Sequence, residues 1–148
     1  MTPAPGTPPK LSPAQQVFDE RADAAQAVIA ASATATTAAL PRVRQLLPDG
    51  WHASGHQAIS GATHTVTIDP PTGVVDATAY LMPRTGDHDG TVTGWWVRVH
   101  NRQQRVDFPL YTDGGARAAI YTSVDDAVAA AITALRIEAV PTVVGRPR

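Results

Sequence analysis

The stretch GWWVRVHNRQQRVDFPLY, from Gly94 to Tyr111, decides the predicted fold because apolar and polar residues alternate in both of its halves. Alternation with a period of two is typical of a β-strand that has one buried face. The two halves therefore predict an antiparallel hairpin with two chemically different faces. The face that we expect to join the core carries Trp95, Val97, Val99, Val106, Phe108 and Leu110.

The opposite face of this hairpin is the predicted binding surface. With Asn101 and Arg102 as a two-residue turn, Arg98 would lie directly opposite Arg105. Two facing guanidinium groups repel each other unless they splay into water, lean on Trp96 or a carboxylate, or share an anion. An indole beside them suits a partner that combines a flat ring with negative charge. The predicted surface comprises Trp96, Arg98, His100, Arg102, Arg105 and Asp107.

The sequence also allows a structural role for Trp96. A tryptophan side chain is rarely left fully exposed. In this alternative, the N-terminal arm or a helix of the same chain covers it.

A second hairpin is predicted just before the first. Two runs of strand-forming residues, 63–69 and 74–82, flank the sequence PPTG at 70–73, which begins with proline and ends with glycine as many turns do. In the register that this tight turn implies, Ile68 lies opposite Val75. The preceding residues 51–60 are a poor strand because a glycine interrupts them.

A long helix is predicted before the sheet. Ser12, Pro13 and Gln15 supply an N-cap, a proline at the first helical position and a capping-box partner. The helix would be about 50 Å long, more than the width of a small domain. Because Pro41 has no N–H to donate, we expect a kink or a break near Leu40.

A seam of apolar and small residues runs along this helix at alternating steps of four and three. In one interpretation the seam packs across the sheet as core. In the other, its small side chains let a second copy or a partner helix approach closely, and a helix that overhangs the sheet would favour this interpretation. The seam consists of Phe18, Ala22, Ala25, Ile29, Ser32, Thr36, Ala39, Val43 and Leu46.

A second helix is predicted after the sheet. Ser123 provides its N-cap, and Asp126 follows three residues later. Its apolar stripe comprises Val124, Ala127, Val128, Ala131, Ile132 and Leu135.

The order of these elements predicts an α+β fold: a long N-terminal helix, an antiparallel sheet of about five strands and a C-terminal helix, with both helices on one sheet face. The chain has 148 residues, a length that suits one domain. We expect residues 12–138 to form this domain. Residues 1–11 are rich in proline and predict a disordered arm, and residues 139–148 predict a flexible tail.

The composition limits the function classes. The formal net charge of −1 argues against a protein whose whole surface binds nucleic acid or membrane. There is no cysteine, so disulfides and thiolate-bound zinc are excluded. Arginine outnumbers lysine eleven to one, as in proteins encoded by GC-rich bacterial or phage genomes. Without an apolar run typical of a secretory signal or a membrane span, we expect a cytoplasmic protein.

No catalytic, cofactor or metal motif is present in the sequence. His52 and His56 lie about 13 Å apart if the chain between them is extended, too far to share one ion unless it turns at Gly55. The loop 87–89 lacks the later ligands of a calcium loop. Glycines do not have the spacing of a phosphate-binding loop, and no serine occupies a nucleophile elbow. We therefore expect no cofactor and no bound metal.

These observations favour a non-catalytic binding or adaptor module that presents the aromatic and basic sheet face to a macromolecular partner. A protein partner is slightly favoured, with self-association through the seam from Phe18 to Leu46 as one form of it. The alternative is a nucleic-acid-binding protein in which Trp96 stacks on a base while Arg98 and Arg105 hold phosphate. The third hypothesis is an enzyme of unrecognised type.

Overall fold

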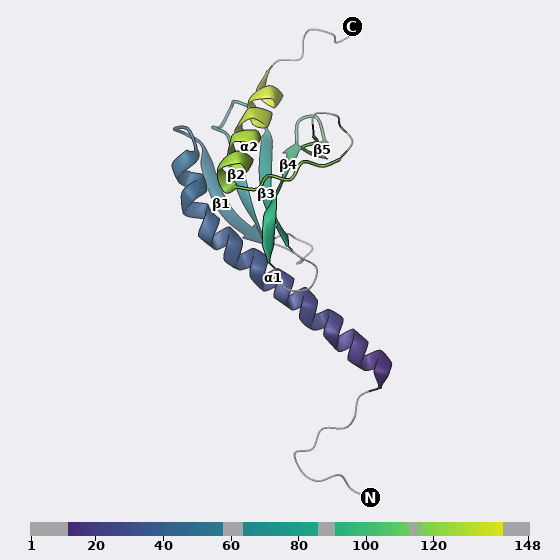
Figure 1. Cartoon of the computed structure of the whole chain (residues 1–148). Coiled ribbons are helices and arrows are strands. Elements are labelled where there is room, and N and C mark those ends of the chain that lie inside the picture. The colour runs from purple at the N-terminus through teal and green to yellow at the C-terminus, as the bar shows by residue number, and fades with distance from the viewer. Residues whose placement is uncertain (1–11, 58–63, 86–90, 113–114, 116, 141–148) are drawn as a thin grey trace, which may run out of the picture.

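A computed structural model describes residues 12–57, 64–85, 91–112, 115 and 117–140 of the chain, without the side chains of residues 56 and 57. It has the α+β architecture that the sequence predicts, with two helices and a five-stranded antiparallel sheet in the order β1-β2-β3-β4-β5 (Figure 1). The elements are α1 (Pro13–Leu46), β1 (His52–Gln57), β2 (His64–Asp69), β3 (Ala77–Thr85), β4 (Val92–Asn101), β5 (Val106–Pro109) and α2 (Val124–Ala139).

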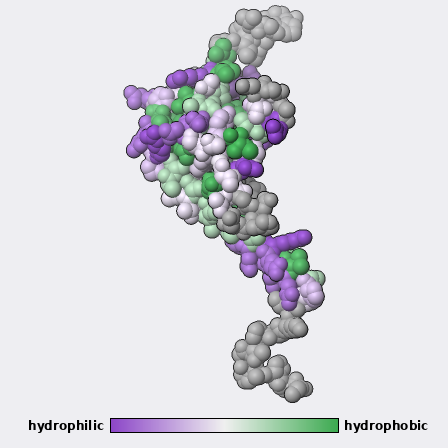
Figure 2. Space-filling view, in the orientation of Figure 1, coloured by the Kyte–Doolittle hydropathy of each residue, from purple (hydrophilic) through white to green (hydrophobic). Residues whose placement is uncertain are grey.

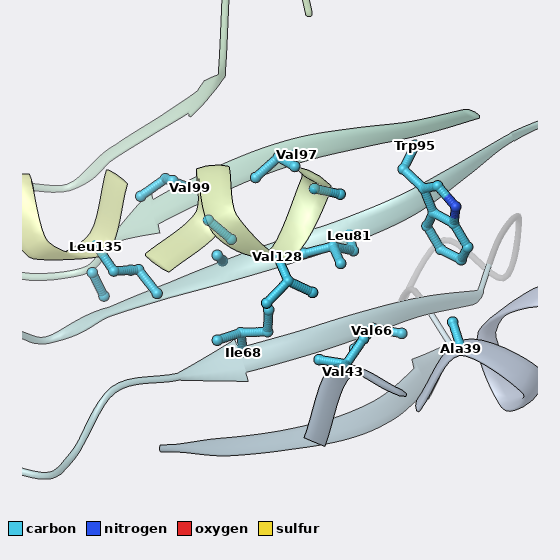
Figure 3. Packing of buried hydrophobic residues seen from close by; sticks show 14 residues of the cluster. Ala39, Val43, Val66, Ile68, Leu81, Trp95, Val97, Val99, Val128 and Leu135 are labelled. Atoms are coloured by element: carbon cyan, nitrogen blue, oxygen red, sulfur yellow. The ribbon is translucent and has the colours of Figure 1, made fainter. Parts of the chain in front are cut away.

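Both helices cover the same face of the sheet. The C-terminal part of α1 lies over β1, β2 and β3, whereas α2 lies over β3 and β4 beside it (Figure 1). Small side chains let the helices approach, and Figure 3 shows Trp95 reaching from β4 toward α1, where Ala39 lies. The buried apolar residues are Ala39, Val43, Val66, Ile68, Ala77, Ala79, Leu81, Trp95, Val97, Val99, Ala127, Val128, Ala131 and Leu135.

The predicted helix starts are confirmed. The Ser12 hydroxyl accepts a hydrogen bond from the Gln15 N–H at 3.2 Å, and the Ser123 hydroxyl accepts one from the Asp126 N–H at 3.1 Å. These bonds satisfy N–H groups that have no partner within the helix. Of the two outcomes expected near Leu40, a kink or a break, the structure excludes the break, because α1 continues through Pro41 as far as Leu46. Pro41 is exposed, so water can reach the backbone carbonyl that loses its hydrogen bond there.

Only the C-terminal part of α1 contributes to the core. The 34-residue helix is about 51 Å long, and its buried residues begin at Ser32. The N-terminal part projects beyond the sheet (Figure 1), and Figure 2 shows it standing free of the body of the domain. The seam is thus core from Ser32 onward, whereas Phe18 is 70% exposed.

Both hairpins differ from the predicted register by four residues. Arg98 lies opposite Pro109 and not opposite Arg105. Ile68 lies opposite Ala79 and not opposite Val75. The predicted two-residue and four-residue turns are wrong because the connecting loops are longer, namely residues 102–105 and 70–76.

Polar contacts between the two loops explain the longer connections. The Asn101 Oδ1 atom accepts the Gln104 N–H at 3.0 Å, which closes the β4–β5 loop locally. Arg102 N–H donates to the Asp76 carbonyl at 2.9 Å, and Arg102 Nε donates to Asp76 Oδ1 at 2.7 Å. The Arg102 Nη1 atom also donates to the Thr78 hydroxyl at 2.9 Å. One arginine therefore holds both loops outside the strands.

Despite these differences in register, buried and exposed side chains alternate along β4 and β5 as predicted, with one exception. Trp95, Val97 and Val99 are buried as predicted. Val106, also predicted to be core, is 40% exposed because it lies at the end of the edge strand β5. Phe108 is partly buried and packs against the core.

The predicted terminal segments are only partly described. The proline-rich arm, residues 1–11, lies outside the described residues, as do residues 141–148. The helix predicted to end at Glu138 ends at Ala139. Neither described helix combines the length and apolar character needed to cross a membrane.

An ion pair between the helices gives a first testable prediction. Arg42 of α1 donates from Nε to Asp125 Oδ1 at 3.0 Å and from Nη2 to Asp125 Oδ2 at 2.7 Å. The hydrogen bond from Arg42, followed by its charge, lowers the pKa of the Asp125 carboxyl below its ordinary value. Asp125 also lies in the first turn of α2, where a negative charge interacts favourably with the helix dipole.

We expect the Asp125 carboxyl to titrate at higher pH in the Arg42→Ala variant than in the wild type, as followed by carboxyl NMR. Because the pKa of the Asp125 carboxyl is lower in the folded than in the unfolded chain, its pair with Arg42 stabilises the fold above a pH of about 4. This contribution is lost as the pH falls further and the carboxylate is protonated. High salt should reduce the difference, since both groups are exposed. An identical Asp125 titration in both proteins would contradict the pairing.

Candidate functional site

The sheet face that the helices leave uncovered is the candidate site. Residues directly opposite each other on neighbouring strands share a face, so the observed register defines which side chains lie together on this surface. They form three rows across the strands. The first contains Met82 and Trp96, the second Thr67, Tyr80, Arg98 and Pro109, and the third Thr78, His100 and Asp107.

Trp96 lies at the centre of an apolar group on this face. Met82 is opposite it on β3. On its other side, the antiparallel bridge between Trp95 and Tyr121 brings Ile120 next to Trp96. Ile120 is 40% exposed, and the Arg84 guanidinium lies 5.9 Å from the centre of the Trp96 ring. We call Met82, Arg84, Trp96 and Ile120 the Trp96 patch.

The exposure of Trp96 differs clearly from that of its neighbour. Trp95 is 5% exposed within the core, whereas Trp96 is partly exposed on the opposite side of the sheet. A cation within about 6 Å of an indole face is held by the ring's electrostatic field. The patch therefore offers a flat apolar surface bordered by positive charge.

Arg98 is paired with a carboxylate, which is one of the outcomes that the sequence leaves open. The guanidinium is hydrogen-bonded to Asp107 Oδ1 on β5. His100 Nδ1 lies 3.4 Å from Asp107 Oδ2 without the geometry of a hydrogen bond. Asp107 thus faces both groups, because it lies directly opposite His100 and next to Arg98.

The two remaining arginines of the predicted surface lie away from its centre. Arg102 is bound to Asp76 and Thr78 at the loop end of the sheet. Arg105 is exposed in the β4–β5 loop, where its φ of 58° lies in the left-handed region that non-glycine residues seldom adopt. The predicted placement of Arg105 directly opposite Arg98 is therefore wrong.

The charges on this face and at its loop end nearly balance. Arg98 and Arg102 each pair with an aspartate, and the Asp69 carboxylate accepts a hydrogen bond from the Thr78 hydroxyl at 2.6 Å. A surface with nearly equal numbers of both signs attracts a phosphate backbone only weakly over long range. The charged side chains are Arg84, Arg98, Arg102 and Arg105 against Asp69, Asp76 and Asp107.

A cleft of about 490 Å³ lies between the β2–β3 and β4–β5 loops. Asp69 and Asp76 are its two carboxylates. Each already accepts a hydrogen bond, from Thr78 and from Arg102 respectively. The cleft therefore presents no unengaged carboxylate among its described lining residues to act as a general base.

Within the described part of the chain, no three histidine, aspartate or glutamate side chains gather as a metal site would need. The histidine at position 88, with its neighbouring aspartates, lies outside the described residues. The side chain of the histidine at position 56 is also outside the described part of the structure.

Sequence reasoning missed three members of the Trp96 patch. The alternation of β3 places Met82 and Arg84 on the same side as Tyr80, which lies opposite Arg98, so the pattern of this strand contained the signal. No pattern in the sequence predicts that Ile120 lies next to Trp96. Its place depends on two backbone hydrogen bonds between Trp95 and Tyr121, at 2.7 and 2.9 Å, which join segments distant in sequence.

Fold and site together define a two-layer α+β protein in which neither described helix covers the second face of the sheet. Comparison with models of protein families, with curated proteins and with solved structures gives no match.

Proposed function

We propose that the chain is a non-catalytic binding module that contacts a protein partner through the Trp96 patch. The observation that supports this most directly is the partial exposure of Trp96 on a sheet face that neither helix covers. Tryptophan and arginine are the residue types that contribute most often to binding energy at protein interfaces. Met82 and Ile120 add apolar area next to them.

The balance of charge favours protein over nucleic acid as the partner. Proteins that bind nucleic acid gain most of their affinity from arginines and lysines that neutralise phosphates. Here Arg98 and Arg102 are already paired with aspartates, and Arg84 is the member of the patch that borders the indole. A protein surface with a carboxylate near an apolar group would match Arg84 and Trp96.

The patch can be tested by capture of a partner from extracts of the cells that make the protein. We expect a stoichiometric partner on the wild-type chain and a loss of about tenfold or more with Trp96→Ala. Val74→Ala is the control, because Val74 is another exposed apolar residue, at 49%, in the β2–β3 loop outside the patch. Equal capture by wild type and Trp96→Ala would show that the patch is not the contact surface.

The nucleic-acid alternative is tested on the same two variants. Fluorescence polarisation of labelled single-stranded and duplex oligonucleotides at two salt concentrations should show no binding for a protein-binding module. Binding that weakens with salt and disappears in Trp96→Ala would instead identify a nucleic-acid-binding protein.

A further inference from the structure

The projecting part of α1 is a surface that contributes neither to the core nor to the Trp96 patch. The seam that is buried from Ser32 onward continues without a break into this part of the helix. There it leaves Phe18 70% exposed, and Ala22 and Ala25 are exposed as well. An apolar face on an isolated helix gains no burial, and most helical stability in proteins comes from packing such a face. A second helix that packed here would therefore stabilise the projecting part.

The sizes of the side chains in this seam follow the same order, large, small, small and large, in both directions along the helix. Phe18, Ala22, Ala25 and Ile29 follow one another at steps of four, three and four, with large residues outside and alanines inside. A two-fold interface requires a surface that is complementary to itself. When two such helices run antiparallel, Phe18 of each meets Ile29 of the other, and Ala22 meets Ala25. Alanines at the centre let the two backbones approach closely.

The charges beside the seam suit this arrangement. In antiparallel pairing, Asp19 of one helix lies beside Gln26 of the other, so that an amide N–H can donate to a carboxylate. Arg21 lies beside Val28, and no two like charges face each other across the seam. The C-terminal continuation of the seam is covered by the chain's own sheet, so self-association through the whole stretch from Phe18 to Leu46 is wrong.

We infer that the projecting part of α1 pairs antiparallel with the same part of a second copy of this chain. The bodies of the two domains then lie at opposite ends of the helix pair, because each projecting helix extends away from its own sheet (Figures 1 and 2). A parallel pair would bring both bodies to the same end. Since the contact is one helix pair of about four turns, we expect a reversible dimer with a dissociation constant in the micromolar range.

Sedimentation equilibrium of the full chain tests the association. At roughly 100 μM the wild type should be dimeric, and Phe18→Asp should raise the dissociation constant at least tenfold. Val17→Asp is the matched control, because Val17 is also exposed, at 47%, but lies beside the seam and not in it. A monomeric wild type, or equal effects of the two substitutions, would overturn the inference. Circular dichroism should show that both variants stay folded, since neither residue contributes to the core.

Introduced cysteines test the direction of pairing, because the chain has none of its own. We expect oxidation to cross-link a mixture of Phe18→Cys and Ile29→Cys chains but neither variant alone. In the antiparallel pair, the two thiols introduced by Phe18→Cys would be separated by about 16 Å along the axis, too far for a disulfide. Cross-linking of Phe18→Cys with itself would indicate a parallel pair and overturn the inference.

Discussion

Trp95→Ala is expected to lower the free energy of unfolding by about 3–5 kcal/mol, the largest effect of any substitution discussed for this protein. Trp95 is 5% exposed and packs within the buried cluster between the sheet and both helices. Its removal leaves a cavity that the surrounding helices and strands cannot fill without moving. Urea denaturation followed by circular dichroism measures the change.

Trp96→Ala is the matched comparison, one residue further along the same strand. Because its side chain points to the uncovered face, we expect this substitution to cost about 1 kcal/mol or less. The two variants thus compare the two faces of the strand: Trp95 belongs to the core, and Trp96 belongs to the proposed binding surface. Equal destabilisation by both would mean that Trp96 is structural, and the proposed binding surface would lose its main support.

Gly94→Ala is expected to destabilise the fold by about 1–3 kcal/mol. A Cβ atom at this position would lie 2.7 Å from Ile120 Cγ2 and 2.9 Å from the Tyr121 carbonyl oxygen. The backbone of Tyr121 cannot move away freely, because it is hydrogen-bonded to Trp95 in both directions. The shift in the midpoint of urea denaturation reports the cost.

Gly55→Ala is the control for this prediction. Gly55 also lies within a strand, but an added Cβ would be 3.8 Å from Thr36 Cγ2 and 3.9 Å from Leu40 Cδ2, which are ordinary contacts. We expect little change or a slight gain in stability, since alanine reduces the conformational freedom of the unfolded chain. If both glycine variants were equally stable, the close approach of the Tyr121 segment to β4 would be refuted.

The two proposed surfaces complement each other. In an antiparallel dimer, each domain would present its Trp96 patch at one end of the helix pair. Such a dimer could hold two partner sites at once, and its avidity for a repeated or dimeric partner would exceed the affinity of one patch. Phe18→Asp should remove this avidity and leave binding of a single site unchanged.

The sequence by itself determined the two helix starts and the two faces of β4. Ser12 and Ser123 cap the helices through bonds to N–H groups three residues away, and such contacts are local. The alternation in β4 assigned Trp95 to the core and Trp96 to the opposite face. These assignments are insensitive to the pairing of the strands, because a shift by an even number of residues keeps each side chain on its face.

Only the tertiary structure decided the strand register, and with it the chemistry of the site. The registers of both hairpins differ by four residues from the predicted ones. Arg102, in the β4–β5 loop, binds Asp76 and Thr78, which precede it by 26 and 24 residues in the sequence, and these bonds stabilise the longer loops. In the observed register, Asp107 lies opposite His100 and next to Arg98, and Arg105 lies outside the strands. Local sequence favours the tightest turn that its residues allow, whereas the folded chain adopts the longer loops because a distant partner satisfies their polar groups.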